Sequence, residues 1–138
     1  MSKPVVLFLC VHNAGRSLAA RVLLDYYGQG RIDVRSAGSE PADTLNPSVV
    51  AILRARGLNP DKEFPKALTQ KAASEADIVV TMGCGDTCPV YPGKRYLNWE
   101  LEDPAGQPLD VVRPIIDDID RRTQDLLAEL LDQATEGP

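Results

Sequence analysis

A cysteine and an arginine stand six positions apart in one short segment, Cys10-Val11-His12-Asn13-Ala14-Gly15-Arg16-Ser17. A thiolate is a strong nucleophile, and a guanidinium can bind two oxygens of a phosphate-like anion. A loop between a buried strand and a helix start points several backbone N–H groups at one spot. These N–H groups, together with Arg16, favour the thiolate form of Cys10. The segment therefore predicts an oxyanion site with a nucleophilic sulfur at its base.

The other residues of this loop have supporting roles. Ser17 can donate a hydrogen bond to the sulfur, Asn13 can hold the loop through its side chain, and Gly15 allows backbone geometry that other residues resist. His12 is the one histidine of the chain, and we expect it to shape the loop rather than to act as a general base. The predicted oxyanion-binding residues are Val11, His12, Asn13, Ala14, Gly15, Arg16 and Ser17.

A structural cysteine at the end of a core strand is the alternative interpretation, because free cysteine is often buried. The apolar run before Cys10, the glycine within the loop and the helical pattern after Ser17 favour the catalytic interpretation.

Strands and helices alternate along the chain. Residues 4–9 form a continuous apolar run that predicts a buried strand, and apolar residues at helical spacing then predict a helix that ends near Gly28. Asn46 is expected to cap the next helix and Asp110 the last one. The other predicted elements are a strand over 31–36 closed by Ala37-Gly38, helices over 48–56 and 69–76, strands over 77–82 and 95–99, and the long final helix, with Pro114 near its first turn.

This order of elements favours an α/β fold, a three-layer sandwich with a mostly parallel sheet. Ligands of such sheets bind beyond the carboxyl ends of the strands. Cys10 and the segment 82–88 both follow buried strands, so we expect both at the same edge of the sheet. A length of 138 residues fits one domain over 1–138.

Composition limits the partners and the location. The net charge of −5 argues against nucleic acid, because phosphate backbones select a basic face. The apolar run at the start is too short to span a bilayer and lacks the flanks of a signal peptide, so we expect a cytoplasmic protein with no membrane partner.

Three cysteines in that compartment favour thiol chemistry or metal binding over disulfides. A zinc site would need Cys10 and His12 beside Cys84 and Cys88, which would destroy the anion site, so no metal is predicted.

The loop from Cys10 to Ser17 resembles the phosphate loop of the low-molecular-weight protein tyrosine phosphatase superfamily. Asp103-Pro104 is similar to the general-acid loop of that superfamily, and the resemblance extends over essentially the whole chain, including Arg35-Ser36-Ala37-Gly38. It implies a four-stranded parallel sheet flanked by helices, with Asp103 as general acid.

Within this superfamily the chain is more similar to the arsenate reductases. Phosphatases of this type usually carry aromatic residues after the Asp-Pro pair, whereas Ala105-Gly106 follow here and cannot stack on a ring. Cys84 and Cys88 are extra thiols that a reductase can use and a phosphatase does not need. The resemblance implies that Cys10 attacks arsenate, that Asp103 protonates the departing oxygen, and that arsenite is released in arsenic detoxification.

Two reductants stay open. In thioredoxin-linked relatives, one loop cysteine resolves the adduct on the nucleophile and a second presents the disulfide to thioredoxin; Cys84 and Cys88 lie closer together than the pair in those relatives. The segments 91–96 and 99–106 are similar to those of actinobacterial arsenate reductases that use mycothiol with a glutaredoxin-like protein (mycoredoxin), and this similarity slightly favours mycothiol. Either route needs an external thiol and no bound cofactor. Arg21 replaces the acidic residue of potassium-binding relatives, so a bound monovalent cation is not expected.

Two other functions remain open at this stage. A tyrosine phosphatase would share Cys10, Arg16 and Asp103, and a non-catalytic oxyanion-binding module could use the same fold.

Overall fold

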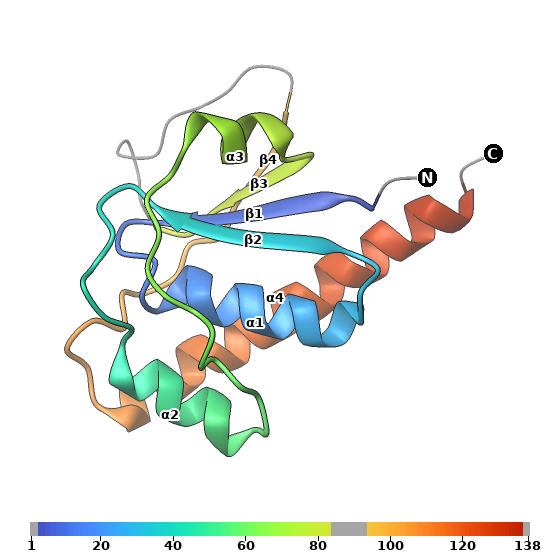
Figure 1. Ribbon diagram of the computed structural model, residues 1–138. Coiled ribbons are helices and arrows are strands. Elements are labelled where there is room, and N and C mark those ends of the chain that lie inside the picture. Colours follow the sequence, from blue (N-terminus) through green and yellow to red (C-terminus); the bar gives the residue numbers. More distant parts are fainter. Residues whose placement is uncertain (1–2, 84–93, 137–138) are drawn as a thin grey trace.

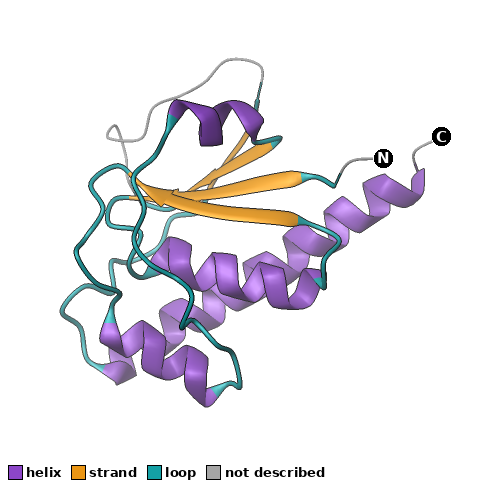
Figure 2. Cartoon of the chain, viewed as in Figure 1, coloured by secondary structure: helices purple, strands orange, loops and turns teal. Residues whose placement is uncertain are grey.

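The computed structural model describes residues 3–83 and 94–136. Its centre is a parallel sheet with the strand order β2-β1-β3-β4, which lies between two layers of helix (Figures 1 and 2). The strands are β1 (Val5–Cys10), β2 (Asp33–Gly38), β3 (Ile78–Thr81) and β4 (Arg95–Asn98). This arrangement confirms the predicted three-layer α/β sandwich with a four-stranded parallel sheet flanked by helices.

The helices cover the two faces of the sheet unequally. Helix α3 (Gln70–Glu75) lies on one face, and α1 (Arg16–Gly28), α2 (Pro47–Ala55) and α4 (Leu109–Glu136) lie on the other (Figure 1). Side chains of β1 alternate between the faces, so that Phe8 joins the larger core and Leu9 the smaller one. Among the described helices, none combines the length and the apolar composition needed to cross a membrane.

Most predicted bounds shift by one or two residues. Strand β2 runs over Asp33–Gly38 and not 31–36, because it pairs with β1 along its whole length, up to the partners Cys10 and Gly38. The predicted cap at Asp110 is wrong, because α4 begins at Leu109 and the Pro108 carbonyl oxygen accepts the N–H groups of Val111 and Val112. Pro114 consequently lies inside α4 in its second turn, where the helix lacks one backbone hydrogen bond.

The start of α2 is as predicted. Pro47 is the first helical residue, and the side-chain oxygen of Asn46 accepts the N–H groups of Ser48 and Val49 at 2.9 and 3.2 Å. These bonds satisfy two of the backbone donors that a helix leaves unpaired at its start.

Tyr27 joins α1 to α4. Its hydroxyl donates to Asp120 Oδ1 at 2.7 Å, and Arg56 from α2 donates to the other oxygen of the same carboxylate at 3.2 Å. Burial, followed by the hydrogen bond to Asp120, raises the pKa of Tyr27 to about 12. Because an unfolded tyrosine ionises near pH 10, the native protein keeps a proton between about pH 10 and 12 that the unfolded chain releases.

We therefore expect the free energy of unfolding to fall as pH rises through this range, and to fall less in the Tyr27→Phe variant, which has no phenol proton. Guanidinium chloride unfolding at pH 9, 10 and 11 measures the difference between the two proteins. Parallel pH dependences of wild type and variant would show that Tyr27 holds no such proton.

Candidate active site

The loop between β1 and α1 begins at the carboxyl end of a central strand. Gly15 is the N-cap of α1, and no side chain accepts a hydrogen bond from the first turn of this helix. The N–H groups at the start of α1 therefore remain available to an anion, and the helix dipole adds to their effect.

The segment 39–46 turns the carbonyl groups of the loop outward. The carbonyl oxygens of Cys10, Val11, His12 and Ala14 accept backbone N–H groups from Ser39, Glu40, Ala42 and Asn46 at 3.1, 2.8, 3.0 and 2.8 Å. In a planar trans peptide the N–H points opposite to the carbonyl, so the N–H groups of the same peptides face the other way. The N–H of Asn13 shows this direction, because it donates to Cys10 Sγ at 3.2 Å. The N–H groups of these peptides thus point away from the segment 39–46, and that of Asn13 points at the Cys10 sulfur.

The sulfur of Cys10 receives a second polar contact from the start of α1. Ser17 Oγ lies 3.0 Å from Cys10 Sγ, and Asn13 Nδ2 donates to the same hydroxyl oxygen at 2.7 Å. The hydroxyl hydrogen of Ser17 is therefore free to point at the sulfur. Asn13 also accepts the N–H of Lys66 at 2.8 Å and has the left-handed φ of 51° in this loop. Asn13 and Ser17 therefore occupy the positions that their predicted roles require.

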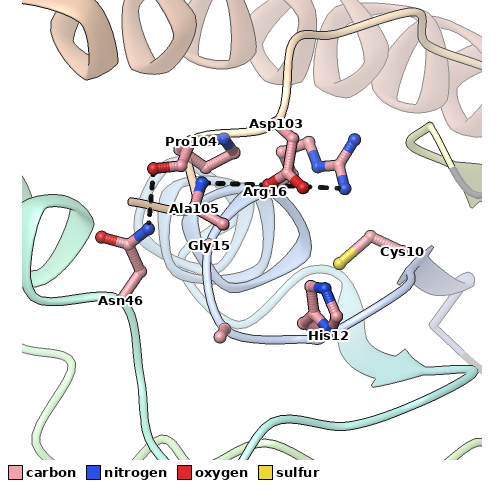
Figure 3. A pocket seen from close by; sticks show the side chains of 9 residues that line it. Cys10, His12, Gly15, Arg16, Asn46, Asp103, Pro104 and Ala105 are labelled. Carbon is pink, nitrogen blue, oxygen red and sulfur yellow. Dashed lines mark hydrogen bonds and ion pairs between the residues drawn. The ribbon is translucent and has the colours of Figure 1, made fainter. Parts of the chain in front are cut away.

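Arg16 and Asp103 meet beside the loop. Arg16 is 5% exposed, and its Nη2 lies 3.9 Å from Asp103 Oδ1. Its Nη1 donates to the carbonyl oxygen of Leu101 at 3.5 Å. Figure 3 shows the Cys10 sulfur, the Arg16 guanidinium and the Asp103 carboxylate around one space. The fold thus brings an exposed carboxylate from a distant segment beside the thiol and the guanidinium of the loop.

The pocket at this point is small. Its volume is about 30 Å³, well below the 300–1,000 Å³ of most small-molecule sites. It is lined by Cys10, His12, Ala14, Gly15, Arg16, Asn46, Asp103, Pro104 and Ala105 (Figure 3). Of these described residues none is phenylalanine, tyrosine or tryptophan, so the pocket offers a phenol ring no stacking partner. The size and the lining both fit a small inorganic oxyanion.

The remaining predicted residues differ in position. His12 Nδ1 lies 3.2 Å from the Glu40 carbonyl oxygen, a bond that fixes the ring to the segment 39–46. The side chain of Val11 packs against the smaller core, and Val11, Asn13 and Ser17 are not among the residues that line the pocket. Cys84 and Cys88 lie outside the described residues. Within the described part of the chain, no group of three histidine, cysteine, aspartate or glutamate side chains could hold a metal ion.

Sequence reasoning identified Asn46 only as a helix cap. In the structure it lines the pocket, and its Nδ2 donates to the carbonyl oxygen of Pro104 at 3.1 Å. The Asn-Pro pair reveals the cap, but no local pattern connects Asn46 with a residue 58 positions away.

Comparison with known proteins gives the family. The family model described as low molecular weight phosphotyrosine protein phosphatase matches residues 5–136. The solved structure of a thioredoxin-dependent arsenate reductase of Corynebacterium glutamicum is 46% identical with a TM-score of 0.82; the match covers 96% of this chain and 64% of that one. The chain thus spans slightly less than two thirds of the length of that protein.

Two curated relatives are matched over most of their length. An arsenate reductase of Halalkalibacterium halodurans is 36% identical over 109 residues, which cover 76% of this chain and 77% of the relative. A glutaredoxin arsenate reductase of Synechocystis sp. is 29% identical over 128 residues, which cover 91% of this chain and 97% of the relative. The chain belongs to the low molecular weight phosphotyrosine protein phosphatase family, in which its relatives include arsenate reductases.

Proposed function

We propose that this protein reduces arsenate to arsenite, with Cys10 as nucleophile. The observation that carries the proposal is the position of the Cys10 sulfur in a small pocket, between the N–H groups of the loop and the Arg16 guanidinium. The names of the relatives support arsenate as the oxyanion. The absence of a phenylalanine, tyrosine or tryptophan ring among the described lining residues supports it over a phosphotyrosine.

In the first step the Cys10 thiolate forms a bond to the arsenic of H₂AsO₄⁻. One oxygen leaves as water after it takes a proton from Asp103, and a Cys10–S–AsO₃H⁻ adduct remains. Loop N–H groups and the Arg16 guanidinium hold the other oxygens and stabilise the charge that develops on them. Arsenic is still in its +5 state at this point, because no electrons have been transferred.

The second step transfers two electrons. A second thiolate attacks the Cys10 sulfur, a disulfide bond forms, and the electron pair of the sulfur–arsenic bond stays with arsenic, which leaves as arsenite. The attacking thiol comes from Cys84 in a relay with Cys88 and thioredoxin, or from mycothiol, which a glutaredoxin-like protein then regenerates. The named relatives include a thioredoxin-dependent and a glutaredoxin enzyme, which supports an external thiol reductant of this kind. Such reductants operate in the cytoplasm, where we place the reaction.

Arsenite formation and aryl phosphate hydrolysis, measured on the same preparation, test the proposal. We expect turnover of arsenate with a thiol reductant to exceed hydrolysis of p-nitrophenyl phosphate. Strong hydrolysis without arsenite formation would identify a phosphatase instead. Oxyanion binding without either reaction would identify a non-catalytic module.

Serine variants of Cys84 and Cys88 identify the reductant. If the thioredoxin relay operates, each variant loses turnover with thioredoxin and thioredoxin reductase. If mycothiol and mycoredoxin supply the second thiol, both variants keep full activity with that pair. Each variant is compared with wild type in both reductant systems, so that a general loss of folding, which would lower both activities, is recognised.

A further inference from the structure

The start of α2 is attached to both of the loops that form the pocket. The backbone N–H of Asn46 donates at 2.8 Å to the carbonyl oxygen of Ala14, which lies in the loop of residues 10–17, here called the oxyanion loop. Its side-chain oxygen caps α2, and its Nδ2 donates to the Pro104 carbonyl oxygen at 3.1 Å. Asn46 therefore connects the oxyanion loop, the helix and the segment that carries Asp103 (Figure 3).

The segment 99–108 depends on such contacts, because it contains no helix or strand. Ser48 Oγ, from the second residue of α2, donates to the Gln107 carbonyl oxygen at 3.2 Å. Pro104 is buried against Gly15, so closely that a Cβ added to this glycine would lie 2.8 Å from the proline ring. The residue next to Asp103 is thus held from two sides, by the oxyanion loop and by α2.

Asp103 itself has few attachments. Its side chain is 51% exposed, and its Oδ1 accepts the N–H of Ala105 at 3.0 Å and lies 3.9 Å from Arg16 Nη2. The bond with Ala105 orients the carboxyl group relative to its own segment, and the contacts of Arg16 with Asp103 and with the Leu101 carbonyl oxygen are long, at 3.9 and 3.5 Å. The contacts of Pro104 with Asn46 and Gly15 attach the same segment to the pocket a second time.

We propose that Asn46 is a positioning residue for the general acid: its amide holds Pro104 so that Asp103 stays within reach of the oxygen that leaves. This inference rests on the proposed role of Asp103. Asn46 contacts the segment through the backbone of Pro104 and takes no part in proton transfer. The proposal therefore predicts that the amide of Asn46 affects the reaction through Asp103, although Asn46 also lines the pocket.

The side chain of Asn46 has two functions that substitutions can separate. In Asn46→Ser the hydroxyl still caps α2 but is too short to reach Pro104, and in Asn46→Asp the carboxylate caps α2 but has no N–H to donate. Both variants should keep the melting temperature close to that of wild type. Asn59→Ser is the matched control, because Asn59 Oδ1 makes a comparable turn contact, with the N–H of Asp61 at 2.9 Å, on an exposed residue.

A double-mutant cycle with Asp103→Ala tests the inference. We expect Asn46→Ser to lower kcat/KM for arsenate by about 10- to 100-fold, mainly through kcat, as for a misplaced catalytic group. Asp103→Ala should lower it by about 10² to 10⁴-fold, the usual contribution of a general acid. With Asp103 already removed, Asn46→Ser should have no further effect. Asn59→Ser should match wild type.

Multiplicative losses in the double variant would overturn the inference, because Asn46 would then act on the oxyanion loop or on folding in general. Wild-type activity of Asn46→Ser would overturn it as well. The role of Asn46 can be tested even if the protein turns out not to reduce arsenate. If the protein hydrolyses p-nitrophenyl phosphate but does not reduce arsenate, the same cycle is run with that substrate, since a phosphatase would use Cys10, Arg16 and Asp103 in the same way.

Discussion

We expect the replacement of Cys10 with serine to abolish the proposed arsenate reduction and to leave oxyanion binding in place. The loss should be on the order of 10⁶-fold, the scale seen when an enzyme loses its nucleophile, because a serine hydroxyl is far less acidic and far less nucleophilic than a thiol. The N–H groups of the loop are oriented by the hydrogen bonds that the segment 39–46 makes with the loop carbonyls, and these do not involve the sulfur. Steady-state arsenite formation measures the activity, and isothermal titration with arsenate measures the binding.

Cys10→Ser also separates the catalytic interpretation from its rivals. Loss of both reduction and p-nitrophenyl phosphate hydrolysis, with binding retained, is the expected pattern. A variant that reduces arsenate as fast as wild type would remove Cys10 from the chemistry. A variant that no longer binds oxyanion would show that the sulfur, and not the peptide groups, organises the loop.

We expect the replacement of Gly83 with alanine to displace the Arg16 guanidinium, although Gly83 lies outside the oxyanion loop. A Cβ on Gly83 would overlap with Arg16 Nη1, so the buried guanidinium would have to shift, and its contacts with Leu101 and Asp103 would change. We expect kcat/KM for arsenate to fall by about 10² to 10³-fold, as when one oxyanion-stabilising donor is lost. Arg16→Lys, which loses the bidentate geometry, should give a loss of similar size.

The alanine also introduces backbone strain, because Gly83 has a φ of +84°. Gly30→Ala is the matched control: its φ of +82° is nearly the same, and a Cβ there would meet nothing within 4 Å. Both variants should lose a similar amount of stability in thermal unfolding, whereas only Gly83→Ala should lose activity. Equal activity in the two glycine variants would mean that Arg16 does not need its present position.

The sequence predicts the oxyanion loop well because the determinants of that loop are local. A buried strand, Gly15 and a following helix indicate the loop, and the contacts among Cys10, Asn13 and Ser17 lie within it. The bonds from the segment 39–46 to the loop carbonyls and from Lys66 to Asn13 join distant segments and were not predicted. The order of strands and helices is predicted for the same reason. The spacing of apolar residues within a short stretch indicates a helix or a strand, and this spacing can be read without knowledge of the distant contacts.

Contacts between distant segments are not predictable in this way. The bond from Asn46 to Pro104 and the approach of Gly83 to Arg16 depend on how separate loops pack. The end of β2 is likewise set by its partner, since Gly38 pairs with Cys10 at the far end of β1. The wrong cap at Asp110 has a similar origin: a good capping side chain was available, but the chain begins α4 two residues earlier than a cap at Asp110 implies, with the carbonyl of Pro108 as an acceptor.

The proposed reaction needs a reactive Cys10 sulfur at an oxyanion site, and alkylation measures both properties at once. The protein is treated with iodoacetamide at pH 6 with and without arsenate or phosphate, and modification of each cysteine is followed by peptide mass spectrometry. We expect Cys10 to react much faster than cysteine in a short peptide and to be protected by either oxyanion in a saturable manner. Reaction of Cys10 at the rate of the peptide thiol, with no protection by oxyanion, would contradict the account.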